Sequence, residues 1–335
     1  MPWLRGFRPS GRSGALFCAA AWLVWPTPAG ADLITRENME NGLTITRAQC
    51  AALPEAVWVR AFGQDFCIRY YASTAGGEGR KPVVFLEGDV IVDKMEKPRD
   101  TNNFTKRAER LSKMAKVPGI YLARPGYDGS SGHIRMRHKW IELQAVNAAL
   151  DAIKQRHKFD GFHLIGQSGG AMVIGGLLGL RRDIGCAVPG AGVLARTGTP
   201  PPGIQLKDRM VNAAAAIDWI VRNSKARILV VTDPQDKIVA YGAQTRFVKA
   251  LRKAGGKAEQ YFVEATDEKH HGVMSYSMSA VSACIRGAPP IEISAGLARM
   301  RARFLAAKAQ REAAEAANNE SPATPARPRA APNRT

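Results

Sequence analysis

The stretch from Phe159 to Leu180, FDGFHLIGQSGGAMVIGGLLGL, decides the fold. A short apolar run of strand type, residues 161–165, precedes Gly166-Gln167-Ser168-Gly169-Gly170, and a longer apolar run, residues 171–180, follows it. The longer run is apolar on all sides and predicts a buried helix. A strand, a sharp turn with Gly-x-Ser-x-Gly and a buried helix form the context in which this motif indicates a nucleophile. The same letters also occur in glycine-rich turns without chemistry.

The glycines of the motif have a steric role. The turn strains the backbone of Ser168, and a Cβ at Gly166 or Gly170, two residues away on either side, would collide with it. The helix that begins after Ser168 directs free N–H groups and a partial positive charge at any anion that forms beside the serine. We therefore expect Ser168 to act as a nucleophile.

The N-terminus has the pattern of a secretory signal peptide. Residues 1–14 carry three Arg and no acid, residues 15–25 are apolar, and Ala29-Gly30-Ala31 resembles a cleavage site. The apolar run is shorter than the about 20 residues that a membrane-spanning helix needs. We expect cleavage after Ala31 and export to the periplasm or the medium.

The chain is strongly basic, with a formal net charge of +19, which becomes +16 when the three Arg of residues 1–31 are removed. The positive residues are scattered and do not form one run. We find no nucleic-acid recognition motif, so nucleic acid is not an expected partner. A solvated basic surface favours, at most, weak association with an anionic cell envelope. The sequence does not indicate an oligomeric state.

Four cysteines remain after loss of the signal peptide: Cys50, Cys67, Cys186 and Cys284. An even number in an exported chain favours disulfides, and four cysteines permit three connectivities. Our interpretation pairs Cys50 with Cys67 and Cys186 with Cys284. Four buried free thiols are the alternative that spacing leaves open.

Strands and helices alternate along most of the chain. Strands are predicted at 65–71, 82–86, 119–123, 161–165, 184–188, 227–232 and 258–263, and helices at 103–116, 140–158, 171–180, 213–223, 241–253 and 270–286. This alternation predicts a mostly parallel sheet with helices on both faces. The 193–212 segment is a loop too short for a large lid, so little or no cap domain is expected.

We expect a single domain over residues 32–305, with its core at about 65–286 and residues 32–45 along the surface. Residues 306–335 are rich in Ala, Pro and Arg and are predicted to form a disordered tail.

Partners for the serine follow it in the order acid, then histidine. Asp236 lies in the loop after the strand that ends at Thr232, and His271 lies in the loop after the last strand. The carboxyl ends of parallel strands meet at one edge of a sheet, so all three candidates fall on that edge. A serine hydroxyl needs a base and an acid that orients the base, and this set supplies both.

The chain resembles α/β-hydrolase fold enzymes of the serine esterase, lipase and peptidase superfamily, from about residue 65 to 286. Five stretches carry the resemblance: Phe85–Asp89, Arg124–Tyr127, Gly166–Gly170, Asp236–Val239 and His271–Gly272. It implies an α/β-hydrolase fold and a catalytic triad of Ser168, His271 and Asp236. It requires no metal or organic cofactor and implies a small-molecule or acyl substrate.

The resemblance also implies an oxyanion hole. In the family the first stretch usually reads His-Gly, and the residue after that glycine lends a backbone N–H. The matching donors here are the N–H groups of Asp89, after Gly88, and of Gly169. Glu87 replaces the usual histidine, and a carboxylate beside a developing oxyanion is unhelpful unless it points away.

Two of the triad candidates, the aspartate and the histidine, have a second residue of the same type close by in the sequence. Asp236 fits the family's Asp-x-x-Val pattern, whereas Asp233 reads as a residue that caps or braces the loop. His271, followed by Gly272, fits better than His270. The remaining histidines, His133, His138, His157 and His163, read as surface or packing residues. Arg124 and Asp128 read as braces of their loop, with a role in substrate binding as the alternative.

The sequence therefore predicts an exported serine hydrolase that cleaves an ester, thioester or amide through an acyl-enzyme. A chymotrypsin-like protease is excluded, since its histidine and aspartate precede the serine and its fold has only strands. Two alternatives of other classes remain: a non-catalytic binding or scaffold protein with this fold, and a basic module that binds the cell envelope.

Overall fold

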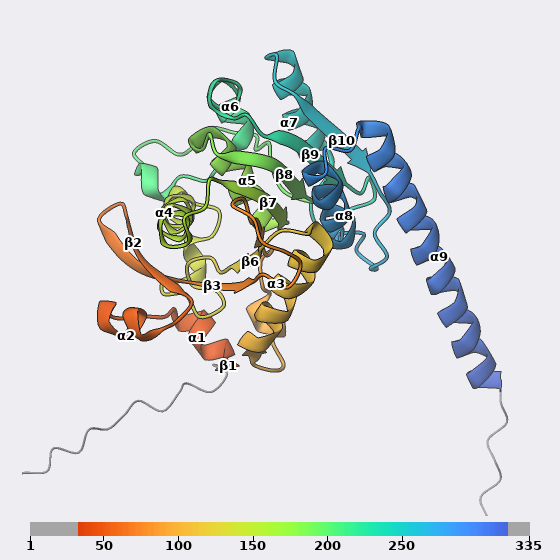
Figure 1. Cartoon of the computed structure of the whole chain (residues 1–335), viewed down its shortest axis with the longest axis horizontal. Coiled ribbons are helices and arrows are strands. Elements are labelled where there is room, and N and C mark those ends of the chain that lie inside the picture. Colours follow the sequence, from red (N-terminus) through yellow and green to blue (C-terminus); the bar gives the residue numbers. More distant parts are fainter. Residues whose placement is uncertain (1–32, 321–335) are drawn as a thin grey trace, which may run out of the picture. The chain divides into compact units, whose positions relative to one another are not determined.

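The fold is built on an eight-stranded sheet in the order β10-β9-β8-β7-β4-β6-β3-β2 (Figure 1). Six strands run parallel: β4 (Val83–Leu86), β6 (Gly119–Leu122), β7 (Phe162–Gln167), β8 (Ile184–Gly190), β9 (Arg227–Thr232) and β10 (Ala258–Phe262). The other two are antiparallel: β3 (Gln64–Ser73) to β6, and β2 (Ala56–Ala61) to β3. The predicted mostly parallel sheet is thus confirmed.

This computed structural model describes residues 33–320, which form one compact unit. The predicted signal peptide, residues 1–31, and residues 321–335 of the predicted tail lie outside the described residues.

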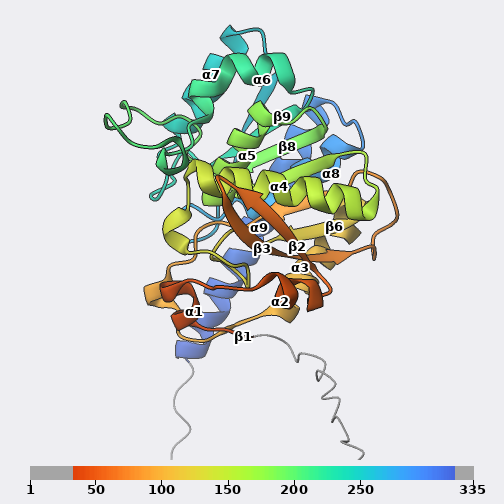
Figure 2. The same cartoon turned by 90° about the vertical axis from the view of Figure 1, so that its left-hand side faces the viewer.

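Helices cover both faces of the sheet, because side chains along each strand alternate between two cores. On β4, Val84 and Leu86 join the core beneath four helices: α4 (Trp140–His157), α5 (Gly169–Leu180), α6 (Ile217–Asn223) and α7 (Gly242–Lys253). Val83 and Phe85 join the opposite core, beneath α3 (Thr101–Ala115), α8 (Met274–Ile285) and α9 (Pro290–Glu320). Figure 2 looks onto the α4 side of the sheet.

Smaller elements complete the fold at the N-terminal side. Strands β1 (Leu33–Ile34) and β5 (Arg99–Asp100) pair with each other, and α1 (Arg36–Asn41) and α2 (Arg47–Ala52) follow β1. Short 3-10 turns are η1 (Val92–Lys94), η2 (Ile134–Met136), η3 (Leu206–Asp208) and η4 (Ala213–Ala216).

Both disulfides that were predicted from the sequence are present. Cys50–Cys67 joins α2 to β3, and Cys186–Cys284 joins β8 to α8. The second bridge fastens a helix of one layer to a strand near the middle of the sheet.

Several predicted boundaries differ from the structure. Residues 32–45 were expected along the surface, yet Ile34 and Met39 are buried in the core beneath α3. Strand β2 was not predicted and extends the core before residue 65. Helix α8 begins at Met274, so both candidate histidines, His270 and His271, lie in the loop before it.

The predicted disordered tail was wrong for residues 306–320, because α9 continues to Glu320. Ile293 and Leu297 are buried and fix its first turns against the core. The Ala-rich sequence that follows has high helix propensity and extends the helix from this anchored start. The domain boundary expected at residue 305 therefore falls inside a helix.

The strand order determines where a site can form. From β4 the chain passes to β6 on one side, and it returns to β7 on the other side of β4. Loops that leave the carboxyl ends of β4 and β7 therefore diverge and open a crevice, which is where α/β sheets bind ligands. The β4 strand ends just before Glu87, and β7 ends just before Ser168.

Candidate active site

Ser168 occupies the sharp turn between β7 and α5, with φ of 52° and ψ of −117°. A left-handed backbone is uncommon for a residue with a Cβ and stores strain. Close packing explains the flanking glycine: a Cβ at Gly170 would lie 2.1 Å from the carbonyl oxygen of Leu86 at the end of β4. The Ser168 hydroxyl forms no hydrogen bond within residues 33–320, which leaves it available to a ligand.

His271 and Asp236 lie together as predicted. The Nδ1 atom of His271 is 2.8 Å from Oδ2 of Asp236, whose side chain is fully buried. The other carboxylate oxygen, Oδ1, accepts the backbone N–H groups of Ile238 and Val239 at 2.8 and 2.9 Å. These bonds fix the carboxylate, which in turn fixes one side of the imidazole ring.

The loop that carries His271 is attached to the serine turn. The side-chain amide of Gln167, the residue before Ser168, donates to the backbone carbonyl of His271 at 2.6 Å. Asp267 braces the same loop by accepting the N–H groups of His271 and Gly272. Burial opposes ionisation of Asp267, but these bonds prevail and lower its pKa. The sequence did not single out Asp267 or Gln167 for these roles.

A second histidine and aspartate lie beside the first pair. The Nδ1 atom of His270 is 3.1 Å from Oδ2 of Asp233, and His270 has a left-handed φ of 54°. The Asp233 carboxylate also accepts the N–H groups of Gln235 and Ala265 at 2.8 and 2.7 Å. Asp233 therefore braces the loop after β9, as expected, and it holds His270 as well.

The predicted oxyanion donors flank Ser168. Within the described chain, neither the N–H of Asp89 nor that of Gly169 is committed to another backbone or side-chain acceptor. The chain before Asp89 passes close to the nucleophile: a Cβ at Gly88 would lie 3.1 Å from Cβ of Ser168. Only a glycine lets the β4 loop approach the serine so closely without displacement.

The Asp89 side chain also enters the site, which the sequence did not indicate. Its carboxylate lies 2.6 Å from Nη2 of the buried Arg124 and 2.7 Å from Nε2 of His138. Burial alone would raise the pKa of Asp89, but the nearby His138 and the charge of Arg124 hold it well below its usual range. Asp89 is therefore ionised, with its charge offset by these two neighbours.

His138 was wrongly placed among the surface or packing histidines. Its left-handed backbone, with φ of 66°, and the bridge between Lys139 and Met210 turn its ring toward Asp89. The buried Glu142 supports the arrangement by accepting the N–H of His138 at 2.5 Å and a bond from Arg124 at 2.9 Å. The other histidines pack as expected; burial and the nearby Lys81 lower the pKa of His163 to about 4.

The side chain of Glu87 points away from the serine turn, although its backbone carbonyl lies close to Gly170. Its carboxylate is held by Arg99, by Arg107 of α3 and by the Tyr121 hydroxyl, the last at 2.5 Å. Tyr121 and α3 belong to the face of the sheet opposite the one that α5 covers. Burial opposes ionisation, yet Arg99 and Arg107 lower the pKa of Glu87. Asp128 joins the same cluster through Arg99 and Tyr121, so it braces its loop as expected.

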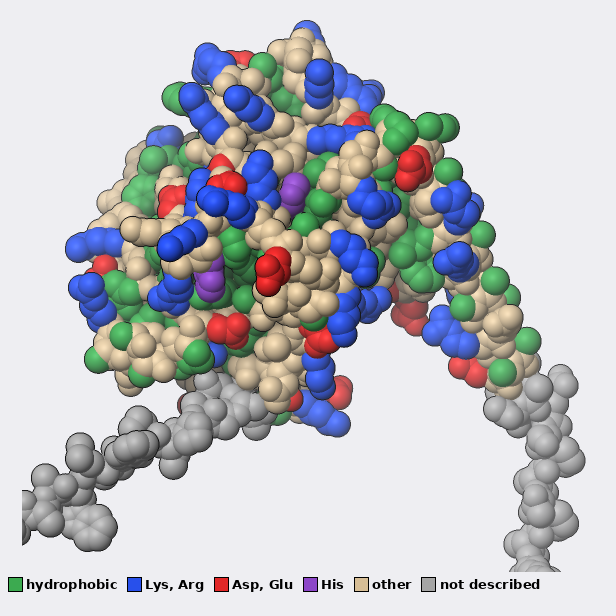
Figure 3. All heavy atoms as spheres, in the orientation of Figure 1, with side chains coloured by type: hydrophobic (Ala, Val, Ile, Leu, Met, Phe, Trp, Pro, Cys, Tyr) green, Lys and Arg blue, Asp and Glu red, His purple; other side chains and the backbone are tan. Residues whose placement is uncertain are grey.

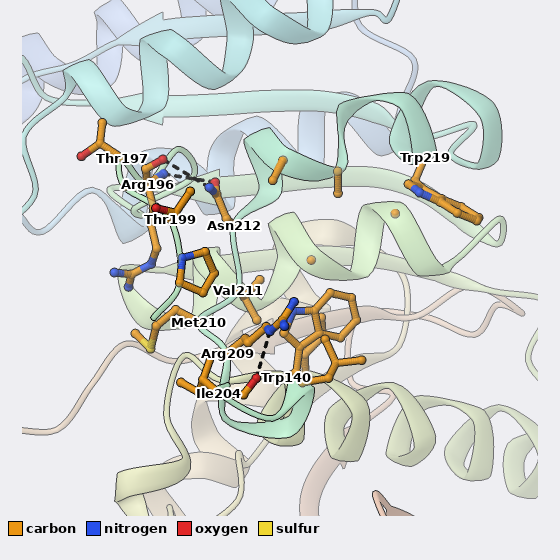
Figure 4. Close-up of a pocket in the computed structure, with 18 of the residues that line it drawn as sticks. Trp140, Arg196, Thr197, Thr199, Ile204, Arg209, Met210, Val211, Asn212 and Trp219 are labelled. Atoms are coloured by element: carbon orange, nitrogen blue, oxygen red, sulfur yellow. Dashed lines mark hydrogen bonds between the residues drawn. The ribbon is translucent and has the colours of Figure 1, made fainter. Parts of the chain in front are cut away.

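Two neighbouring cavities lie near the site, and neither is lined by Ser168 or His271. The larger, about 850 Å³, is formed by α4, α5 and the 196–219 segment, and Trp140 and Trp219 contribute to its walls (Figure 4). The smaller, about 500 Å³, is lined by Asp89, Ile134, Arg135, Arg137, His138, Arg196 and Met210. Arg196 and Met210 line both. The 193–212 segment, which was predicted from the sequence to be a short loop, forms a wall of the larger cavity.

Residues 33–320 contain neither a metal-binding cluster nor a membrane-spanning helix. No group of three or more His, Cys, Asp and Glu side chains is arranged to hold a metal ion. No helix in this part of the chain combines the length and apolar character needed to cross a bilayer.

Known proteins match this chain in structure but not in sequence. No protein-family model matches it, and neither does any curated protein sequence. The esterase Pf2001 of Pyrococcus furiosus is similar at 13% identity in two crystal forms. The first crystal form has a TM-score of 0.52, and the alignment covers 77% of this chain and 99% of the esterase. The second has a TM-score of 0.51, and the alignment covers 74% of this chain and 97% of the esterase.

Est1E of Butyrivibrio proteoclasticus, solved with ferulic acid bound, aligns at 14% identity and a TM-score of 0.49, over 69% of this chain and 98% of that chain. At such identities the similarity concerns the fold alone, and the eight-stranded, mostly parallel sheet of this chain is consistent with it. The chain therefore has the α/β-hydrolase fold.

Proposed function

We propose that this protein is a serine hydrolase that cleaves an ester, thioester or amide bond through an acyl-enzyme. One observation carries the proposal: the strained turn presents Ser168 at the crevice between β4 and β7, and the loop holding the His271–Asp236 pair is fastened to that turn. Pf2001, which shares the fold, is an esterase by name.

Each residue has a defined role in this mechanism. The hydroxyl oxygen of Ser168 attacks the carbonyl carbon, while Nε2 of His271 takes the hydroxyl proton. Asp236 holds the Nδ1–H of the ring, so that Nε2 is the basic nitrogen, and it stabilises the imidazolium that forms. The imidazolium then protonates the leaving group, and water releases the acyl group by the same path.

The N–H groups of Asp89 and Gly169 would hold the oxyanion. Donors that are fixed before the reaction stabilise the developing charge at little cost in reorganisation, and each contributes about 10²–10³ in rate. The positive end of α5, which begins at Gly169, adds to this field. The Asp89 carboxylate is close, and its pairing with Arg124 and His138 limits its repulsion of the oxyanion.

The alternative of a non-catalytic binding or scaffold protein was based on Glu87, which replaces the family's usual histidine. The position of the Glu87 side chain weakens this argument. The Glu87 carboxylate is engaged by two arginines and a tyrosine on the other face of the sheet. A carboxylate held in this way does not crowd an oxyanion beside Gly169. No feature of residues 33–320 favours a scaffold over an enzyme.

Export is part of the proposal. Two disulfides form in the structure, and disulfides persist in oxidising compartments. The basic side chains spread over the face shown in Figure 3 and do not gather in one patch, which is consistent with at most a weak association with anionic envelope. The signal sequence at residues 1–31 remains the sequence basis for this proposal.

Labelling with a fluorophosphonate probe tests the proposed function. The purified mature protein should be labelled, Ser168→Ala should not, and Ser224→Ala, at a partly exposed position after α6, should label like the wild type. A panel of acyl esters of increasing chain length would then define the preferred acyl group. A folded protein that neither labels nor hydrolyses any ester would support the binding-protein alternative.

A further inference from the structure

The smaller cavity beside Ser168 is rich in arginine. Arg135, Arg137 and Arg196 line it, and among the described residues of its wall Asp89 is the only acid. Asp89 is already paired with Arg124 and His138. The cavity therefore carries an excess of positive charge that the protein does not neutralise.

The three arginines have few partners. The side chains of Arg135 and Arg137 form no ion pair or hydrogen bond with another described residue. Arg196 is half-buried, its Nη2 contacts only the sulfur of Met172 at 3.4 Å, and its buried Nε has no hydrogen-bond acceptor. Burial without a carboxylate lowers the pKa of Arg196. An anion in this cavity would supply the missing acceptor.

The arginine cavity adjoins the nucleophile. Asp89 and His138, two of its lining residues, lie over Gly169, where a Cβ would come within 2.4 Å of Oδ1 of Asp89 and 3.0 Å of Nε2 of His138. Gly169 follows Ser168 directly and offers one of the proposed oxyanion donors. A group bound in the cavity can therefore belong to the same molecule as a carbonyl that reacts at Ser168.

The larger, more apolar cavity shares part of its wall with the arginine cavity. Arg196 and Met210 belong to both, and Figure 4 shows Arg196 at the end of the larger cavity that is far from Trp219. Trp140, Leu206 and Trp219 provide apolar surface beyond it. The combined site has a positive part beside the reactive serine and an apolar part farther away.

We propose that the substrate is an anionic acyl compound: its carboxylate or phosphate group binds Arg135, Arg137 and Arg196, and its apolar portion occupies the cavity lined by Trp140 and Trp219. This inference rests on the proposed hydrolase function and narrows its substrate class. Arginine suits the role because its planar guanidinium binds carboxylate and phosphate in a two-pronged manner.

A matched pair of para-nitrophenyl esters tests the inference. One is the monoester of glutarate, and the other is its isostere in which an isopropyl group replaces the carboxylate; spontaneous hydrolysis of each is subtracted. We expect kcat/KM to be about tenfold or more higher for the anionic ester, since a charge-assisted bond contributes about this much. Added salt should reduce the ratio of the two values, because it screens exposed charges.

Arginine variants locate the effect. Arg196→Gln should lower the anionic-to-neutral ratio of kcat/KM by about tenfold, and Arg135→Gln combined with Arg137→Gln should lower it as well. Arg182→Gln removes the same charge at an exposed position outside both cavities, and its ratio should equal that of the wild type. An anionic-to-neutral ratio of kcat/KM near one in the wild type would overturn the inference. The same ratio in the wild type and in every arginine variant would also overturn it. Either result would leave the hydrolase proposal unaffected.

A binding measurement decides the inference even if neither ester is hydrolysed. Glutarate and inorganic phosphate are titrated separately into Ser168→Ala by calorimetry. Binding that Arg196→Gln abolishes supports the anion site, and the tighter ligand identifies the substrate's acid as carboxylate or phosphate. Absence of binding by both ions overturns the inference. Loss of turnover together with intact anion binding would instead count against the hydrolase proposal alone.

Discussion

The Asp89 carboxylate lies directly against Gly169, where a Cβ would come within 2.4 Å of Oδ1. A negative charge beside the proposed oxyanion donor is tolerable because Arg124 and His138 contact the same carboxylate. Arg124 is itself buried and has Glu142 as its second acidic partner. The geometry beside Ser168 therefore depends on a buried set of charges that must all be present.

Replacing Asp89 should make this dependence measurable. The pKa of Asp89 is lower in the folded protein than in the unfolded chain, where it is about 4. The ionised carboxylate therefore stabilises the folded protein above about pH 4. This stabilisation is lost as the pH falls from about 4 through the pKa of the folded state. At neutral pH, Asp89→Asn should reduce the free energy of unfolding by about 2–4 kcal/mol, because Arg124 loses a charged partner.

Urea unfolding at several pH values checks this prediction. The difference between wild type and Asp89→Asn should shrink below about pH 4. Asp208→Asn, which breaks an exposed pair with Lys139, should cost less than about 1 kcal/mol. A difference that stays constant from neutral to acidic pH would refute the ionised role of Asp89.

Two neighbouring histidines provide a matched test of the triad. His271→Ala should lower kcat by about 10³-fold or more, because Ser168 loses its base, whereas His270→Ala should stay within about tenfold of the wild type. Ester hydrolysis measures both, and circular dichroism controls for folding. The opposite order would assign the base to His270 and its acid to Asp233.

The two disulfides should differ in their effect on stability. Cys186–Cys284 spans 98 residues and Cys50–Cys67 spans 17, and the cost of closing a loop in the unfolded chain grows with its length. Removing both cysteines of the longer bridge should lower the free energy of unfolding by about 4–5 kcal/mol. Removing both cysteines of the shorter bridge should lower it by about 3 kcal/mol. Urea unfolding with and without reductant measures both effects. Equal stability of all forms in oxidising buffer would contradict the prediction.

Helix α9 should matter for stability only as far as its contacts with the core extend, which is up to Phe304. Ile293 and Leu297 are buried, whereas residues 305–315 are exposed. A chain that ends after Pro289 loses both apolar contacts and should be less stable by about 3–6 kcal/mol. A chain that ends after residue 305 should unfold at the same urea concentration as the whole mature chain. Equal destabilisation by both truncations would show that the outer helix also packs.

The hydrophobic pattern predicted most of the sheet, and its omissions have identifiable causes. Strand β2 was missed although Val57 and Val59 are separated by the half-buried Trp58 and followed by the exposed Arg60, because it is a short edge strand that pairs with β3 alone. The helix expected to open at His270 begins at Met274, since Asp267 and Asp233 hold the histidine loop in another conformation.

The sequence by itself determined the elements and the order of the candidate residues. The turn at Ser168 could be predicted because its glycines and flanking apolar runs are local, and local sterics leave one geometry for them. The alternation of strand and helix likewise predicted a parallel sheet, and therefore the shared edge at which Ser168, Asp236 and His271 lie.

Only the tertiary structure decided what surrounds these residues. The pairing of Asp89 with Arg124 and His138, the direction of Glu87 and the arginine cavity join segments far apart along the chain. Charges find partners by proximity in space, and a one-dimensional pattern holds no record of which side chains meet. Arg135 and Arg137 line one cavity together with Arg196, about 60 residues later in the chain, and the bridge between Lys139 and Met210 joins the same two segments.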